Sequence, residues 1–235
     1  MTLAKILKAE GYEPTSADSG PDFSVEMEGK RILIEAVCPG PGDDGNLNSV
    51  PPIVDGAPVF RKVPVEQIVL RIRSALEAKK RRFADYVEQG IVFDGDTCII
   101  AISSSKIDQA SGLWPPPIMR ATHGLGNPYV VFEKGKGAVG EGVESCTSIP
   151  KTNGREIDTT FFFSEENSLI AAVLYSECSV FRCGFDPFRE SMLIHNPKAR
   201  VPLAPGFLKK ISEVWTICAS DGSRWHPYQI NKSAN

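Results

Sequence analysis

Residues 22–38 constrain the fold of this chain more than any other segment. The first part, DFSVEME, has apolar residues at every second position, which is typical of a strand with one buried face. The second part, RILIEAVC, is apolar on both faces, as expected of a strand in the middle of a sheet. Gly29 and Lys30 between them suit a two-residue type II′ turn. The segment therefore predicts a β-hairpin that leads from the edge of a sheet toward its centre.

One acidic residue, Glu35, interrupts the apolar second strand. A buried carboxylate costs free energy unless it is paired with a cation or bound to a metal. In the register set by the expected turn, Asp22 lies opposite Val37 and Ser24 lies opposite Glu35. Asp22 and Glu35 would then be diagonal neighbours on one face, about 7–8 Å apart or less. This pair predicts an acidic metal site; the alternatives are an ion pair with a structural arginine and an exposed sheet edge.

Residues 64–89 carry the strongest helical pattern, with Pro64 in the first turn and Gly90 as the stop. The apolar residues at helical spacing are Val65, Ile68, Val69, Ile72, Leu76, Phe83 and Tyr86. Lys79 falls on this apolar stripe. A lysine in that position either extends its ammonium group into solvent or directs it at a negative group. Lys80 is one step off the stripe and is the alternative candidate.

The remaining pattern predicts an α/β fold in which helices flank a mixed central sheet. Residues 3–10 form a helix that ends at Gly11, residues 39–63 form a long loop, and residues 97–103 form a buried strand. Further expected elements are strands near 129–133, 159–164, 168–175 and 190–195, and a helix at 206–214. We expect one domain over 1–235, with a core at about 3–105 and a loop-rich β extension at about 106–235.

Composition places the chain among ordinary globular proteins, with 42% hydrophobic and 23% charged residues. No segment approaches the roughly 18–20 apolar residues that span a bilayer. The six cysteines contain no CxxC pair, which favours reduced thiols and a cytoplasmic location. The net charge of −3 does not by itself indicate nucleic-acid binding, although Lys79, Lys80, Arg81 and Arg82 form a local basic cluster.

Several common enzyme motifs are absent or lack their context. No GxSxG or HExxH sequence occurs, so a serine hydrolase of the nucleophile-elbow type and a zinc protease are poorly supported. GKGAVG at residues 135–140 matches GxGxxG, but a dinucleotide site needs a helix to begin within that motif. The sequence that follows is loop-like, so we expect a mobile glycine loop there.

Residues 21–37, PDFSVEMEGKRILIEAV, resemble motifs II and III of the PD-(D/E)XK nuclease superfamily. The signature of that family is Pro-Asp, a hairpin, and then acid-x-Lys on the next strand. Pro21 and Asp22 match the first part and Glu35 matches the acid, whereas Val37 stands where the lysine is usual. Some members carry the lysine on the following helix, and Lys79 suits that placement. With its flanking helices and strand, the resemblance covers about residues 3–105 and implies a restriction-endonuclease-like core.

The resemblance implies magnesium-dependent hydrolysis of phosphodiester bonds, with DNA as the expected nucleic-acid substrate. Asp22, Glu35 and the backbone carbonyl of Ala36 would hold Mg²⁺, for which Mn²⁺ could substitute, and Lys79 would complete the catalytic set. Glu10 resembles an acid often present on the first helix of the family. The candidate nucleic-acid contacts are Arg71, Arg73, Arg81 and Arg82.

The resemblance also implies a homodimer, because restriction-type members often dimerise, and it implies no membrane partner. Two alternatives stay open. One is a catalytically inactive protein that keeps the nuclease fold as a binding or assembly module, which Val37 in the lysine position favours. The other is an unrelated α/β domain whose hairpin acids serve ion pairs.

Overall fold

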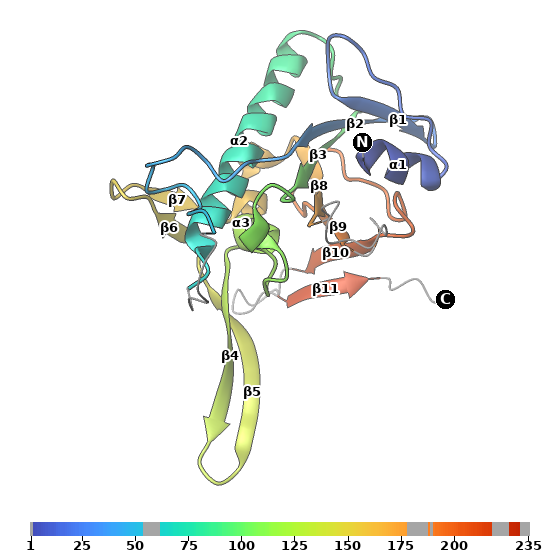
Figure 1. Cartoon of the computed structure of the whole chain (residues 1–235). Coiled ribbons are helices and arrows are strands. Elements are labelled where there is room, and N and C mark those ends of the chain that lie inside the picture. The colour runs from blue at the N-terminus through green and yellow to red at the C-terminus, as the bar shows by residue number, and fades with distance from the viewer. Residues whose placement is uncertain (1, 54–61, 178–187, 189, 218–225, 231–235) are drawn as a thin grey trace.

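The computed structural model describes residues 2–53, 62–177, 188, 190–217 and 226–230. Their fold is mixed α/β around a seven-stranded sheet with the strand order β1-β2-β3-β8-β9-β10-β11 (Figure 1). The strands are β1 (Phe23–Met27), β2 (Lys30–Val37), β3 (Thr97–Ser103), β8 (Ile170–Ser176), β9 (Ser191–His195), β10 (Ser212–Ile217) and β11 (His226–Ile230). The expected fold class, a mixed central sheet flanked by helices, is confirmed.

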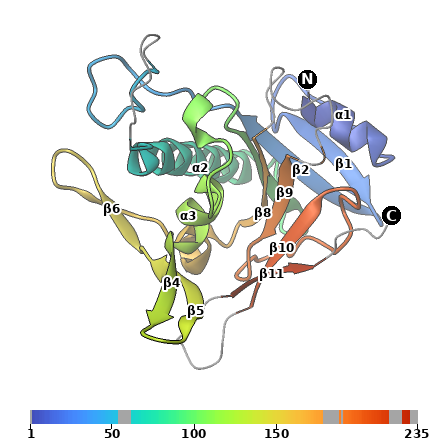
Figure 2. The ribbon, with the colours of Figure 1, turned by 60° about the horizontal axis from the view of Figure 1, so that its bottom comes forward.

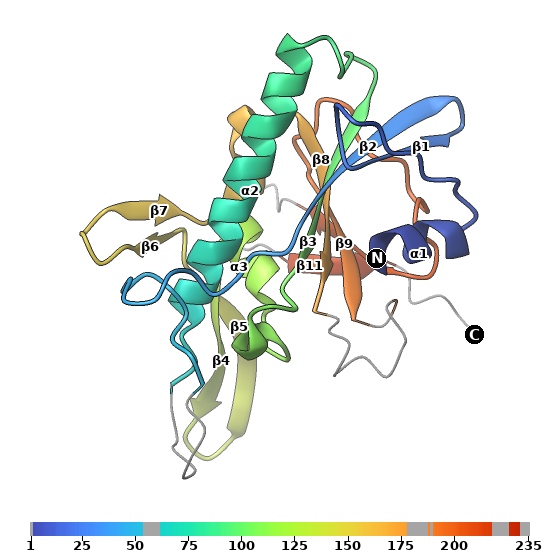
Figure 3. The same cartoon turned by 45° about the horizontal axis from the view of Figure 1, so that its top comes forward.

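Helices lie on both faces of this sheet, as Figure 3 shows with α2 on one side and α1 on the other. The helices are α1 (Thr2–Ala9), α2 (Val65–Glu88) and α3 (Pro117–His123). Ile72 of α2 shares a hydrophobic cluster with Leu33 of β2, whereas Leu7 of α1 shares another with Ile34. Since successive strand residues point to opposite faces, the sheet separates the two clusters. None of the described helices has the length and apolar character needed to cross a membrane.

Strand directions explain why β2 and β3 are apolar throughout. β1 pairs with β2 in antiparallel fashion, and β2, β3 and β8 run parallel to one another. The chain returns from β2 to β3 through α2, which is the crossover that a parallel pair requires. Helices and connecting segments then cover both faces of the central strands. β2 therefore carries Glu35 into the interior of the molecule.

The expected turn of the first hairpin is wrong by one position. Glu28 and Gly29 form the turn, with φ of 53° and 75°, and Met27 pairs with Lys30. Positive φ at both central residues is the type I′ geometry, whose twist matches that of the flanking strands. The pairing moves by two residues, so every side chain keeps the face it was expected to have. Because Phe23 pairs with Ile34, Asp22 lies level with Glu35 rather than diagonal to it.

The C-terminal half differs more from expectation. Residues 159–164 do not form a strand, and a 3₁₀ turn at Phe161–Phe163 packs Phe161 and Phe162 into the core instead. The expected helix at 206–214 is also wrong, because turns lead there directly into β10. β4 (Leu125–Glu133) extends the strand expected at 129–133, and its partner is β5 (Gly137–Ser145). Residues 135–140 thus include the end of the hairpin turn and the first residues of β5, where a mobile glycine loop was expected.

Part of the segment 106–235, which was expected to be a loop-rich β extension, belongs to the central sheet. Four of its seven strands, β8 to β11, come from this part, and β8 pairs directly with β3. β6 (Ser148–Pro150) and β7 (Glu156–Asp158) form a further small sheet beside the helices α2 and α3 (Figure 2). The core therefore draws on both halves of the chain.

Candidate functional site

Glu35 is a buried carboxylate whose two oxygens both have partners. It lies on the face of β2 that α2 covers, and the whole residue is only 3% exposed. Oε2 contacts the ammonium group of Lys79, and Oε1 accepts a hydrogen bond from the Tyr86 hydroxyl at 2.8 Å. A carboxylate in this position would destabilise the fold if it were unpaired. These two residues of α2 therefore compensate its burial.

Lys79 brings the second acid into the same cluster. Its Nζ contacts Glu35 and lies 3.5 Å from Oδ2 of Asp22. The side chain is 21% exposed, so its ammonium group lies between the interior and the solvent. The helical spacing predicts this direction, because Lys79 shares its side of α2 with the buried Leu76 and Phe83. The structure thus brings Asp22, Glu35 and Lys79 together.

Asp22 lies immediately before β1, and its side chain is 46% exposed. Its Oδ2 accepts the backbone N–H of Ala36 at 2.7 Å, which is a contact that a neighbouring strand would otherwise make. The N–H and C=O of one strand residue project toward the same neighbour. The Ala36 carbonyl therefore faces the Asp22 side of β2, which is the orientation that the expected metal ligand set requires.

Tyr86 and Arg82 complete the cluster, although neither was expected beside the acidic pair. The Tyr86 hydroxyl lies 2.8 Å from Glu35 Oε1 and 2.6 Å from the Gly20 carbonyl, and its single proton serves one acceptor at a time. Arg82 Nε donates to this hydroxyl at 3.0 Å. Burial, followed by the hydrogen bond with Glu35, raises the pKa of Tyr86. The available signal was spacing, since Tyr86 follows Lys79 by two helical turns on the same side.

Lys80 and Glu10 lie outside this cluster. Lys80 Nζ pairs with Glu77 Oε2 at 3.0 Å, so the adjacent lysine points along the helix rather than toward Glu35. The Glu10 carboxylate accepts the backbone N–H groups of Lys209 and Lys210 at 3.1 and 2.8 Å. Helix α1 packs on the face of the sheet opposite to Glu35, so Glu10 cannot join the acidic pair.

The four candidate phosphate-binding arginines divide into two groups. Arg73 is buried and donates to the Asp158 carbonyl at 2.6 Å, and it forms ion pairs with Glu77 and Asp158 at 3.0 and 3.7 Å. It therefore supports the structure and is not accessible to a ligand. Arg71 is partly buried and donates to the Gly40 carbonyl at 3.0 Å. Arg81 and Arg82 are exposed on the stretch of α2 that also carries Lys79.

The oxygen donors of the cluster fit a hard divalent cation. Two carboxylates and a backbone carbonyl are ligands of the class that Mg²⁺ prefers, and Mg²⁺ commonly uses one or two carboxylates together with substrate phosphates. Within the described ranges, no three His, Cys, Asp or Glu side chains gather closely enough to hold a metal ion. The site would therefore rest on Asp22, Glu35 and Ala36, and a cation there would compete with Lys79 for Glu35.

No protein-family model, curated protein or solved structure matches this chain. The PD-(D/E)XK resemblance of residues 21–37 thus depends on the motif, on the order of the elements, and on the contacts among Asp22, Glu35 and Lys79. It stays a prediction.

Proposed function

We propose that this protein hydrolyses phosphodiester bonds in nucleic acid, with DNA as its substrate and Mg²⁺ as its cofactor. One observation carries the proposal: the ammonium group of Lys79, on α2, contacts both Glu35 and Asp22 of the hairpin. A cation and two carboxylates in this arrangement are the set that the motif implies. The motif has its lysine at the position of Val37, and in this chain Lys79 of α2 would take the role of that lysine.

The burial of each of these residues suggests its role in the proposed reaction. A magnesium ion, when bound, would polarise the scissile phosphate and lower the pKa of a bound water. Glu35, held from beneath by Tyr86, would fix the inner side of the site, and the half-exposed Asp22 would face the solvent. Lys79 would stabilise negative charge that develops on the phosphate. Arg81 and Arg82 would position the substrate backbone.

A binding or assembly module without catalysis is the second candidate. The observation that favours it is that Lys79 and Tyr86 satisfy the Glu35 carboxylate without a metal ion. In that case the cluster would stabilise the packing of α2 against β2, and nothing more. The two candidates differ in whether a cation can displace Lys79 from Glu35.

The decisive experiment is a cleavage assay on supercoiled plasmid and on labelled single-stranded DNA, double-stranded DNA and RNA. Each substrate is incubated with Mg²⁺, with Mn²⁺, or with EDTA. We expect metal-dependent cleavage by the wild type, its loss in Glu35→Gln, and its retention in Glu77→Gln, a matched change to a carboxylate of α2 outside the cluster. If no substrate is cleaved in a metal-dependent way, the nuclease proposal fails and the module is favoured.

A second readout does not depend on activity. A ligand that binds only the folded state stabilises it by an amount that grows with the logarithm of the ratio of ligand concentration to Kd. We expect Mg²⁺ to raise the melting temperature of the wild type progressively once its concentration exceeds the Kd, and to have no such effect on Glu35→Gln. An equal response of the two proteins would mean that Mg²⁺ binds elsewhere.

A further inference from the structure

The hairpin formed by β4 and β5, here called the arm, projects from the body of the molecule (Figure 1). Among the described residues, its sheet contains these two strands and no third one. Its exposed apolar residues are Tyr129 at 46%, Val130 at 51%, Val131 at 47%, Phe132 at 73% and Val139 at 50%. An isolated two-stranded ribbon is marginally stable in water, and Val130 and Phe132 on one of its faces, with Tyr129 and Val131 on the other, are exposed apolar side chains of the kind that an interface covers. We therefore expect another protein surface to cover the apolar side chains of the arm.

The charges of the arm favour a protein partner over nucleic acid. Residues 125–145 contain three glutamates and two lysines, and one of the lysines, Lys136, pairs with Glu133 at 2.7 Å. A surface that binds phosphates needs an excess of positive charge. The two lysines, Lys134 and Lys136, belong to the turn at the tip, whereas Glu141 and Glu144 lie toward the base. Two arms packed antiparallel would place the lysines of one beside the glutamates of the other.

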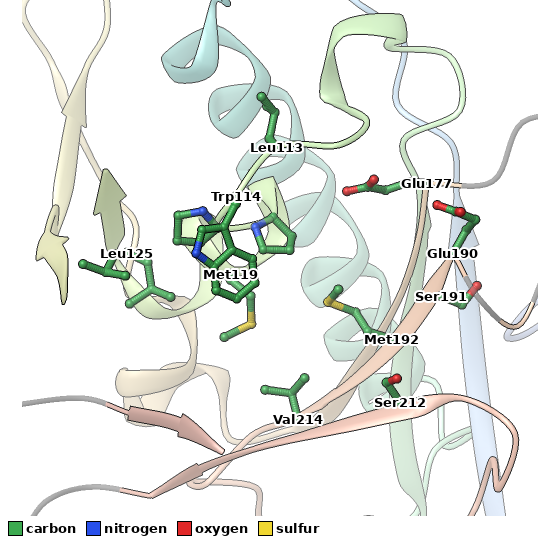
Figure 4. A pocket seen from close by; sticks show the side chains of 13 residues that line it. Leu113, Trp114, Met119, Leu125, Glu177, Glu190, Ser191, Met192, Ser212 and Val214 are labelled. Carbon is green, nitrogen blue, oxygen red and sulfur yellow. The ribbon is translucent and has the colours of Figure 1, made fainter. Parts of the chain in front are cut away.

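An apolar pocket lies at the base of the arm (Figure 4). Its volume is about 380 Å³, which is ample for an aromatic side chain. The apolar side chains that line it include Trp114, Met119, Leu125, Val143, Met192 and Val214. Leu125 and Val143 belong to β4 and β5 themselves, so the apolar surface of the arm continues into the pocket. Trp114 is 67% exposed at its edge.

We propose that two copies of this chain associate through their arms, and that Phe132 of each copy occupies the pocket of the other. One chain carries both the exposed aromatic tip and the apolar pocket, so the two surfaces are complementary under a twofold axis. Antiparallel arms of equal length bring each tip to the opposite base, where the pocket lies. Pro128 removes one backbone donor from β4, which weakens that edge for ladder extension, and the exposed apolar side chains place the contact on the faces of the arms.

The first test is the mass in solution, measured by sedimentation across a dilution series. We expect a dimer for the wild type and a monomer for Phe132→Asp. Leu47→Asp, which alters a residue that is 75% exposed outside the arm, should remain dimeric. Trp114→Ala should weaken the dimer by at least about tenfold, as truncation of an aromatic anchor does. Circular dichroism controls for folding, which an exposed site such as Phe132 should not affect.

The second test identifies what Phe132 touches. A photoreactive phenylalanine analogue at position 132 is activated in a mixture of isotopically heavy and light protein. We expect crosslinks between heavy and light chains that map to residues 113–119. A monomeric wild type, a dimeric Phe132→Asp, or crosslinks confined to one chain would overturn the proposal. So would a Phe132→Asp variant that loses DNA binding with no change in mass.

Discussion

Lys79 and Lys80 are consecutive residues of α2, yet their ammonium groups have different partners. Lys79 Nζ contacts Glu35 and Asp22, whereas Lys80 Nζ lies 3.0 Å from Glu77. With 3.6 residues per turn, neighbouring helical side chains point in clearly different directions. The two lysines therefore form a matched pair for experiment, with the same chemistry and the same helix but only one in the cluster.

The first prediction compares Lys79→Met with Lys80→Met in the cleavage assay. Loss of a preorganised group that stabilises transition-state charge lowers kcat by about 10²–10³. We expect a loss of this size for Lys79→Met and near wild-type cleavage for Lys80→Met. Equal losses in the two variants would indicate that the position of α2, and not the ammonium group of Lys79, governs activity.

The second prediction concerns stability. Lys79→Met leaves the buried carboxylate of Glu35 with Tyr86 as its remaining partner in the cluster. Removal of one partner of a buried charge is costly, and the partial exposure of Lys79 reduces the cost to about 2 kcal/mol. Urea denaturation should show this loss. The double variant with Glu35→Gln should recover much of it, and additive losses would show that the two side chains are not coupled.

The third prediction follows from the type I′ turn. Glu28 has a φ of 53°, which costs a residue with a Cβ about 1 kcal/mol, whereas Asn-Gly is the favoured pair for this turn. Glu28→Asn should therefore stabilise the protein by up to about 1 kcal/mol in thermal or urea unfolding. Glu26→Asn, an exposed change within β1, should not. A destabilised Glu28→Asn would speak against the turn geometry.

The fourth prediction is a pH dependence of stability. Burial lowers the pKa of His123 to about 3, below its ordinary value of about 6.5. Between these values the unfolded chain binds a proton that the folded protein does not, so stability falls as pH falls below about 6.5. The slope from this residue approaches about 1.4 kcal/mol per pH unit. Urea titrations at a series of pH values should show a shallower slope in His123→Gln, and equal slopes would contradict the assignment.

The acidic cluster could be predicted because its members follow local rules. Asp22 and Glu35 share a face through the period-two alternation of strands, which a two-residue error in register leaves unchanged. Lys79 follows from helical spacing along α2. The contact of Tyr86 with Glu35 was missed because it depends on how deeply α2 is seated against β2.

The features that could not be predicted correctly from the sequence depend on contacts between residues far apart in the chain. Glu10 is held by the backbone at Lys209 and Lys210, a segment far along the chain that was expected to be helical. β8 joins the sheet beside β3, a pairing that no local pattern specifies. The sequence places Arg73 on a helix as a candidate phosphate contact. In the structure its guanidinium pairs with Asp158, packs on the Phe161 ring and is buried.

Because Asp22 accepts the Ala36 N–H as well as facing Lys79, substitutions at position 22 can separate its hydrogen bond from its charge. One carboxylate oxygen of Asp22 accepts a backbone N–H, and the charge of the same group faces Lys79. An asparagine has nearly the same shape and still offers an oxygen acceptor, but it carries no charge. An alanine offers neither. Asp22→Asn therefore removes only the negative charge beside Lys79, whereas Asp22→Ala also removes the acceptor for the Ala36 N–H. A comparison of the two variants separates the contribution of the charge from that of the hydrogen bond.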